Sequence, residues 1–81
     1  MNRRVELYGR LRDSGHGDHV MIELPPGATA RQALTALKKA LGSRGDLVNG
    51  CSLATEENVL LQNEIIPTTG RLAALPPVCG G

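Results

Sequence analysis

The sequence predicts an α+β domain in which one main helix packs on one face of a sheet, with elements in the order ββαββ. Two stretches near the N-terminus alternate apolar and polar residues, as half-buried strands do. An amphipathic helix with its own capping signal follows, and short apolar segments bounded by turn residues come after it. Such a helix and sheet bury their apolar faces against each other in two layers.

The two N-terminal strands are expected at residues 4–9 and 19–24. In the first, Val5 and Leu7 point inward, and the outward set is Arg4, Glu6 and Tyr8. In the second, the inward set is Val20, Ile22 and Leu24. Residues 10–18 are polar and contain two glycines, so we expect a loop that joins the strands as a hairpin.

The main helix is expected to begin after Pro25-Pro26-Gly27. Thr29 suits the N-cap position, and Gln32 completes a capping box with it. One apolar stripe follows at helical spacing: Ala33, Leu34, Leu37, Ala40 and Leu41. Lys38 and Lys39 favour the negative end of the helix dipole, and Gly42 is the expected C′ residue.

The second half of the chain is expected to supply the remaining strands. Residues 43–50 are rich in turn formers, apart from Leu47 and Val48, which we expect to fold back onto the core. Short strands are expected at residues 51–55 and 59–61, with a turn at residues 56–58 between them.

The final strand is expected at residues 71–75, with Leu72 and Ala74 inward. Ile65, Ile66 and Pro67 form an apolar segment before it, and residues 68–70 supply the turn. We therefore expect a domain over residues 1–75 and a flexible tail over residues 76–81.

Composition excludes several classes of function. Eighty-one residues permit one modest core, and Tyr8 is the only aromatic residue. The net charge of +1 with mixed signs gives no basic footprint for nucleic acid. No apolar run is long enough to span a bilayer, and the N-terminus lacks the apolar segment of a signal peptide. We expect a cytoplasmic protein without nucleic-acid or membrane partners.

The chain contains two cysteines, Cys51 and Cys79. Two thiols do not form the disulfide framework of a secreted domain, and one chain cannot supply a four-thiol zinc or iron–sulfur site. We expect Cys51 to face the core and expect no disulfide in a reducing compartment.

The tail is the candidate functional segment. Pro76 and Pro77 stiffen it by fixing φ, and Gly80 and Gly81 place two residues without side chains before the final carboxyl group. Such an end passes through a slot that excludes any β-carbon, and residues 77–81 reach roughly 17 Å when extended. We predict that the Gly81 carboxylate is the working group.

The ending Leu75-Pro76-Pro77-Val78-Cys79-Gly80-Gly81 resembles that of the molybdopterin synthase small subunit, a ubiquitin-like sulfur carrier. The first strand and the helix after Pro-Pro-Gly are also similar to the wider β-grasp superfamily, which includes the thiamine-pathway sulfur carrier. The resemblance implies a ubiquitin-like β-grasp fold, with a mixed sheet whose first and last strands are parallel neighbours.

The resemblance also implies the chemistry. A carboxylate is a poor electrophile, so a separate ATP-dependent enzyme similar to ubiquitin-activating enzymes would adenylate Gly81. A sulfur donor protein would then convert the acyl-adenylate to a thiocarboxylate, and the tail would enter the large synthase subunit or another acceptor enzyme. The tail-access residues would be Pro76, Pro77, Val78, Cys79 and Gly80. The carrier itself would hold no cofactor or metal. It would not be an enzyme, although it could serve as the non-catalytic subunit of a synthase.

Several side chains admit two interpretations. Cys79 departs from the small or hydroxyl residue usual at this place, so it is either a simple replacement or a thiol that reacts with the neighbouring thiocarboxylate. His16 and His19, with Asp18 between them, have a spacing that suits a metal but lack a third ligand, so solvated histidines are the simpler reading.

The sequence also leaves undecided which surface binds a partner. The sheet face opposite the helix is the expected docking side, with Tyr8 as one candidate contact. An acidic partner would dock on one of two basic sets, either Arg10, Arg12 and Arg31 or the pair Lys38 and Lys39. For each set, a solvated face is the simpler interpretation. The last turn and strand depart from the family's acidic turn and Phe-rich strand, which leaves the partner's identity open.

Four functions share these features. The first is sulfur carriage for molybdopterin synthesis, and the second is sulfur carriage for thiamine, cysteine or another sulfur metabolite. The third is a ubiquitin-like modifier whose Gly81 is joined to lysines of other proteins. The fourth is a β-grasp interaction module for which the tail is irrelevant.

Overall fold

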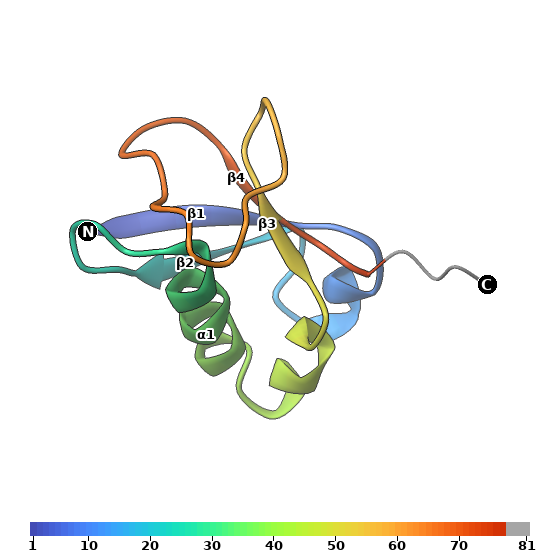
Figure 1. Ribbon diagram of the computed structural model, residues 1–81. Helices are drawn as coiled ribbons and strands as arrows, with labels where there is room; N and C mark the ends of the chain where they lie inside the picture. The colour runs from blue at the N-terminus through green and yellow to red at the C-terminus, as the bar shows by residue number, and fades with distance from the viewer. Residues whose placement is uncertain (78–81) are drawn as a thin grey trace.

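The computed structural model describes residues 1–77; Val78, Cys79, Gly80 and Gly81 lie outside the described residues. Four strands form one sheet in the order β2-β1-β4-β3. Their bounds are Asn2–Leu7 for β1, His19–Glu23 for β2, Ser52–Ala54 for β3 and Leu72–Leu75 for β4. The helix α1, Ala30–Ala40, lies on one face of this sheet (Figure 1).

The sheet is mixed, as expected. β1 pairs with β2 antiparallel, and β4 pairs with β3 antiparallel. β1 and β4 run parallel in the centre, with Val5 opposite Leu72 and Leu7 opposite Ala74. These four residues are at most 1 % exposed, so the inward sets predicted for both strands are confirmed.

The capping box of α1 is present as the sequence predicts. The Gln32 backbone N–H donates to Thr29 Oγ1 at 3.3 Å, and the Thr29 N–H donates to Gln32 Oε1 at 2.8 Å. The first turn gains two further partners, because the N–H groups of Ala30 and Arg31 donate to carbonyls of Glu64 and Gln62. The orphan donors of the helix N-terminus are thereby satisfied by the segment that leads toward β4.

The apolar stripe of α1 faces the sheet. Ala33, Leu37 and Leu41 are buried, while Leu34 and Ala40 are partly buried at its margin. Gly42 has a φ of +59° directly after the helix, where a left-handed residue ends helices favourably. The second 3₁₀ helix, η2 at Gly42–Val48, then returns Val48 to the core and packs on α1.

Residues 10–18 are not the simple polar loop that the sequence predicts. A 3₁₀ helix, η1, spans Gly9–Ser14 and buries Leu11 completely. η1 packs on η2, and the two 3₁₀ helices contribute Leu11 and Val48 to the core. A single leucine in a polar stretch has no periodicity, so the sequence gives no signal for this burial.

Two further expectations are wrong in detail. Residues 59–61 form no strand; Val59 makes only an isolated bridge to Ala54, and Leu60 alone is buried there. β1 begins at Asn2 and ends at Leu7, rather than spanning residues 4–9. The inward set predicted for the second strand is confirmed, because Ile22 and Leu24 are buried and Val20 is partly buried against the core.

We predict that Thr29→Ala lowers the free energy of unfolding by about 1 kcal/mol, because the N-cap hydrogen bond is lost. Urea denaturation followed by circular dichroism measures this change. Thr35→Ala is the matched control, since Thr35 is exposed within the same helix and only returns a hydrogen bond to the Arg31 carbonyl. A loss in the control as large as that in Thr29→Ala would contradict the capping role.

Candidate functional site

The tail leaves the domain from the central part of the sheet. β4 lies between β1 and β3, and its last residue, Leu75, pairs with Ser52. Pro76 and Pro77 follow directly, so the tail starts where a strand held on both sides ends (Figure 1). The core thereby fixes the position at which the tail begins.

Two glycines adjoin the tail prolines. A β-carbon placed on Gly9 would lie 2.8 Å from Pro76 Cγ, closer than real β-carbons approach other atoms, and Gly9 has a φ of +58°. A β-carbon on Gly50 would lie 3.5 Å from Pro77 Cγ. Glycine at position 9 therefore permits both the left-handed turn after β1 and the close approach of Pro76.

The predicted working group, Gly81, lies outside the described residues, as do Val78, Cys79 and Gly80. The roles assigned to these four residues stay predictions. Among the tail-access residues, the structure places Pro76 half-buried and Pro77 exposed.

The face of the sheet opposite α1 carries a shallow hollow of about 120 Å³. Ala54 and Ala73, paired across β3 and β4, are among the small residues that line it. Arg71 Nε contacts Glu6 Oε2 at 3.3 Å beside it, and the Tyr8 hydroxyl donates to Glu6 Oε1 at 3.1 Å. Glu6 and Arg71 are thus paired with each other at this hollow, while the Glu56 carboxylate, which also lines it, accepts a hydrogen bond from the Arg71 backbone N–H.

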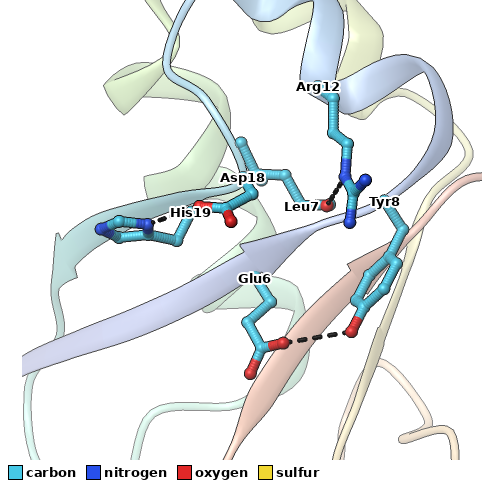
Figure 2. A network of polar contacts seen from close by, with 6 residues as sticks. All are labelled: Glu6, Leu7, Tyr8, Arg12, Asp18 and His19. Carbon is cyan, nitrogen blue, oxygen red and sulfur yellow. Dashed lines mark hydrogen bonds and ion pairs between the residues drawn. The ribbon is translucent and has the colours of Figure 1, made fainter.

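Figure 2 shows how Tyr8 is held. Its ring lies beside the Arg12 guanidinium, whose carbon is 5.5 Å from the ring centroid, while Arg12 Nε donates to the Leu7 carbonyl at 3.0 Å. These contacts fix the exposed Tyr8 ring at the end of β1 nearest the tail. Tyr8 is therefore an ordered contact candidate, and Arg12 has a local structural role.

Of the two histidines considered as metal ligands, His19 forms a hydrogen bond with the neighbouring Asp18. His19 Nδ1 and Asp18 Oδ1 lie 2.9 Å apart at the start of β2 (Figure 2), and this hydrogen bond lowers the pKa of the Asp18 carboxyl. Within residues 1–77, no three histidine, cysteine or acidic side chains gather as metal ligands would. Likewise, no helix in this part of the chain is long and apolar enough to cross a membrane.

Cys51 lies at the start of β3 and is 6 % exposed, so the expectation that it faces the core is confirmed. Its Sγ donates to the Leu47 carbonyl at 3.3 Å. Burial raises the pKa of the Cys51 thiol, although the nearby Arg10 guanidinium acts in the opposite direction. A buried thiol with a raised pKa is a poor nucleophile.

A second, larger groove of about 410 Å³ opens on the helix side of the molecule. Arg31, Thr35 and Lys38 of α1 line one wall, and residues 48–51 with Gln62 line the rest. Lys38 Nζ donates to Asn49 Oδ1 at 3.1 Å, while Arg10 donates to the Asn49 carbonyl from outside the groove. Gly50 belongs both to this groove and to the contact with Pro77.

The basic residues singled out in the sequence therefore separate into two groups. Arg10 and Arg12 bind backbone carbonyls, and Lys39 lies outside the groove. Arg31 and Lys38 lie together on the groove wall. Sequence reasoning missed both the groove and the Gly9–Pro76 contact; the seven-residue spacing of Arg31 and Lys38, two helical turns, was the available signal for the first.

Comparison with known proteins gives matches in structure only. No family model matches this sequence, and no curated protein matches it. Small archaeal modifier protein 1 (SAMP1) of Haloferax volcanii superposes with a TM-score of 0.73 at 24 % identity, covering 100 % of both chains. A Pyrococcus furiosus protein, provisionally named molybdopterin converting factor subunit 1, gives 0.75 at 22 % identity, covering 96 % of this chain and 99 % of its own.

The chain has a ubiquitin-like β-grasp fold. A third solved structure, the HVO 2177 protein of Haloferax volcanii, matches with a TM-score of 0.70 at 15 % identity, covering all of this chain and 87 % of that one. The fold predicted from the element order and the resemblance is therefore confirmed. At these identities the likeness establishes the fold and leaves the function to be argued from the site.

We predict that Gly9→Ala displaces Pro76 and lowers the free energy of unfolding by about 1 kcal/mol or more. Gly17→Ala is the matched control, because Gly17 also has a positive φ, +81°, but no neighbouring atom of residues 1–77 lies within 4 Å of its β-carbon position. Amide chemical shifts near Leu75 and Gly50 should move in Gly9→Ala alone. Equal shifts in both variants would show that the Pro76 contact is unimportant.

Proposed function

We propose that this chain is a ubiquitin-like carrier whose Gly81 carboxyl group is adenylated by a separate enzyme and then converted to a thiocarboxylate. The observation that carries the proposal is the position of Pro76 and Pro77, which begin a Gly-Gly tail at the end of a central strand. A firmly held base and a narrow end suit a tail that must reach into another protein's active site.

In the proposed reaction, the groups that react with Gly81 come from partner molecules. The Gly81 carboxylate attacks the α-phosphorus of ATP in the activating enzyme, and pyrophosphate leaves. The outer sulfur of a persulfide on the donor protein then attacks the acyl carbon, AMP leaves, and an acyl disulfide joins Gly81 to the donor. A thiol next attacks the donor's sulfur and breaks the S–S bond, so Gly81 keeps the transferred sulfur as a thiocarboxylate and the donor's sulfur passes into a disulfide with that thiol. The carrier contributes access and presentation, while the activating enzyme supplies the catalytic groups, so the chain itself is not an enzyme.

The proposed recipient of the sulfur is a pterin precursor, held by the large subunit of a molybdopterin synthase. Support comes from the Pro-Pro-Val element before the Gly-Gly end and from the structural likeness to a protein named as a molybdopterin converting factor subunit. Thiamine, cysteine or another sulfur metabolite would use the same tail chemistry.

A ubiquitin-like modifier is the second candidate, favoured by the likeness to a protein named as a modifier. In that case the activated Gly81 would be joined to a lysine amine of a target protein in place of sulfur. Both candidates require the same adenylation, and they diverge at the acceptor. Isopeptide-linked Gly81 in digests of host proteins would favour the modifier.

We predict that a chain lacking Gly80 and Gly81 folds normally but supports no ATP–pyrophosphate exchange with the adenylating enzyme of its host. Gly80→Val should behave in the same way, because a side chain blocks the narrow passage to the reacting phosphate. Gly17→Ala serves as control, since it changes a glycine on the loop before β2. Undiminished exchange by the truncated chain would instead support a module for which the tail is irrelevant.

A further inference from the structure

The helix-side groove begins where the tail leaves the domain. Gly50 lines the groove and also adjoins the Pro77 ring. From there the groove follows α1 from Lys38 back to Arg31, a distance of about 10 Å at 1.5 Å per residue. Leu34 and Val48 provide apolar surface within it. The groove is therefore next to the base of the tail and extends away from it along the helix.

The charge of the groove is positive and uncompensated. Within residues 1–77, ion pairs join Glu6 to Arg71, Asp18 to His19 and Glu23 to the N-terminus, and none includes Arg31 or Lys38. Of the side chains that the structure describes, no acidic one lines the groove. By contrast, the hollow on the opposite face contains its own acidic partners. The groove thus suits an anionic occupant.

We propose that this groove holds the chain's own C-terminal segment, residues 78–81, with the Gly81 carboxylate between Lys38 and Arg31. The inference deepens the proposed function, because it takes the same free carboxyl group and gives it a resting site. Four residues beyond Pro77 span roughly 13 Å when extended, a length comparable with the separation of Lys38 and Arg31 along α1. Val78 is the one aliphatic residue of the segment and matches the apolar surface at Leu34 and Val48.

A short tether makes weak contacts sufficient. Because the segment is joined to the domain, its effective concentration at the groove is in the millimolar range. Two exposed ion pairs are then enough for the segment to occupy the groove part of the time, and they leave it free to dissociate. The bound carboxylate would be withheld from solution and released when an activating enzyme competes for the tail. Lys38 and Arg31 therefore act as resting contacts for the tail, while the enzyme would supply the reactive ones.

The test places a nitroxide spin label on Cys79 in a Cys51→Ala background and measures paramagnetic broadening of backbone amide signals. We expect the Thr35 and Gln62 amides to broaden more strongly than those of Arg4 and Arg71 on the opposite face. This preference should disappear in Arg31→Gln/Lys38→Gln and weaken at high salt. It should persist in Arg4→Gln/Lys39→Gln, which removes the same charge outside the groove.

A second measurement avoids the label. Carbon-13 NMR of the Gly81 carboxyl group should give a pKa a few tenths of a unit higher in Arg31→Gln/Lys38→Gln than in Arg4→Gln/Lys39→Gln, because nearby cations favour the charged form. Equal pKa values, together with broadening that shows no preference for the groove, would overturn the inference. If the groove variant then also lost its affinity for the activating enzyme, the occupant would be an acidic segment of that enzyme.

These readouts do not depend on sulfur loading. If the segment occupies the groove but Gly81 is not adenylated, the proposed function is refuted and this inference stands. If Gly81 is adenylated but the segment does not occupy the groove, this inference is refuted and the proposed function stands.

Discussion

The parallel pairing of β1 with β4 is the constraint on which the rest of the structure depends. Val5 lies opposite Leu72 and Leu7 opposite Ala74, and all four side chains are buried in the single core cluster. This pairing closes a connection that includes almost every other element, so α1, η2 and β3 must fit within it. It also ends β4 beside Gly9, which determines where Pro76 leaves the core.

The two faces of the molecule differ in how their charges are satisfied. On the open sheet face, Glu6 binds both Tyr8 and Arg71, and Arg71 also donates its backbone N–H to Glu56. On the helix side, Arg31 and Lys38 find no acidic partner among residues 1–77. A partner on the first face meets side chains that are already hydrogen-bonded to one another, whereas an anion on the second face meets two cations without an acidic partner among residues 1–77.

The sequence was most informative where local rules decide the structure. The capping box of Thr29 and Gln32 and the alternation in β1 follow from spacing alone, and both are present. It was least informative where burial depends on distant contacts: Leu11 sits in a polar stretch yet is fully buried, and residues 59–61 are apolar yet contribute one buried side chain. At the site, the predicted end of the last strand at Leu75 is observed, but the Gly9–Pro76 contact joins distant parts of the chain and has no local signal.

The central claim is that the carboxyl group of Gly81 is adenylated and then receives sulfur. The most direct test is the intact mass of the protein purified from its own host, with fragmentation that assigns any change to a residue. Oxidation of a thiol adds the same nominal mass as replacing oxygen by sulfur, so the site of the change is decisive. The account predicts a chain that ends at Gly81, with sulfur in place of one oxygen on that residue in part of the population. An unmodified Gly81, even after incubation with ATP, a sulfur source and the host's adenylating enzymes, would contradict it.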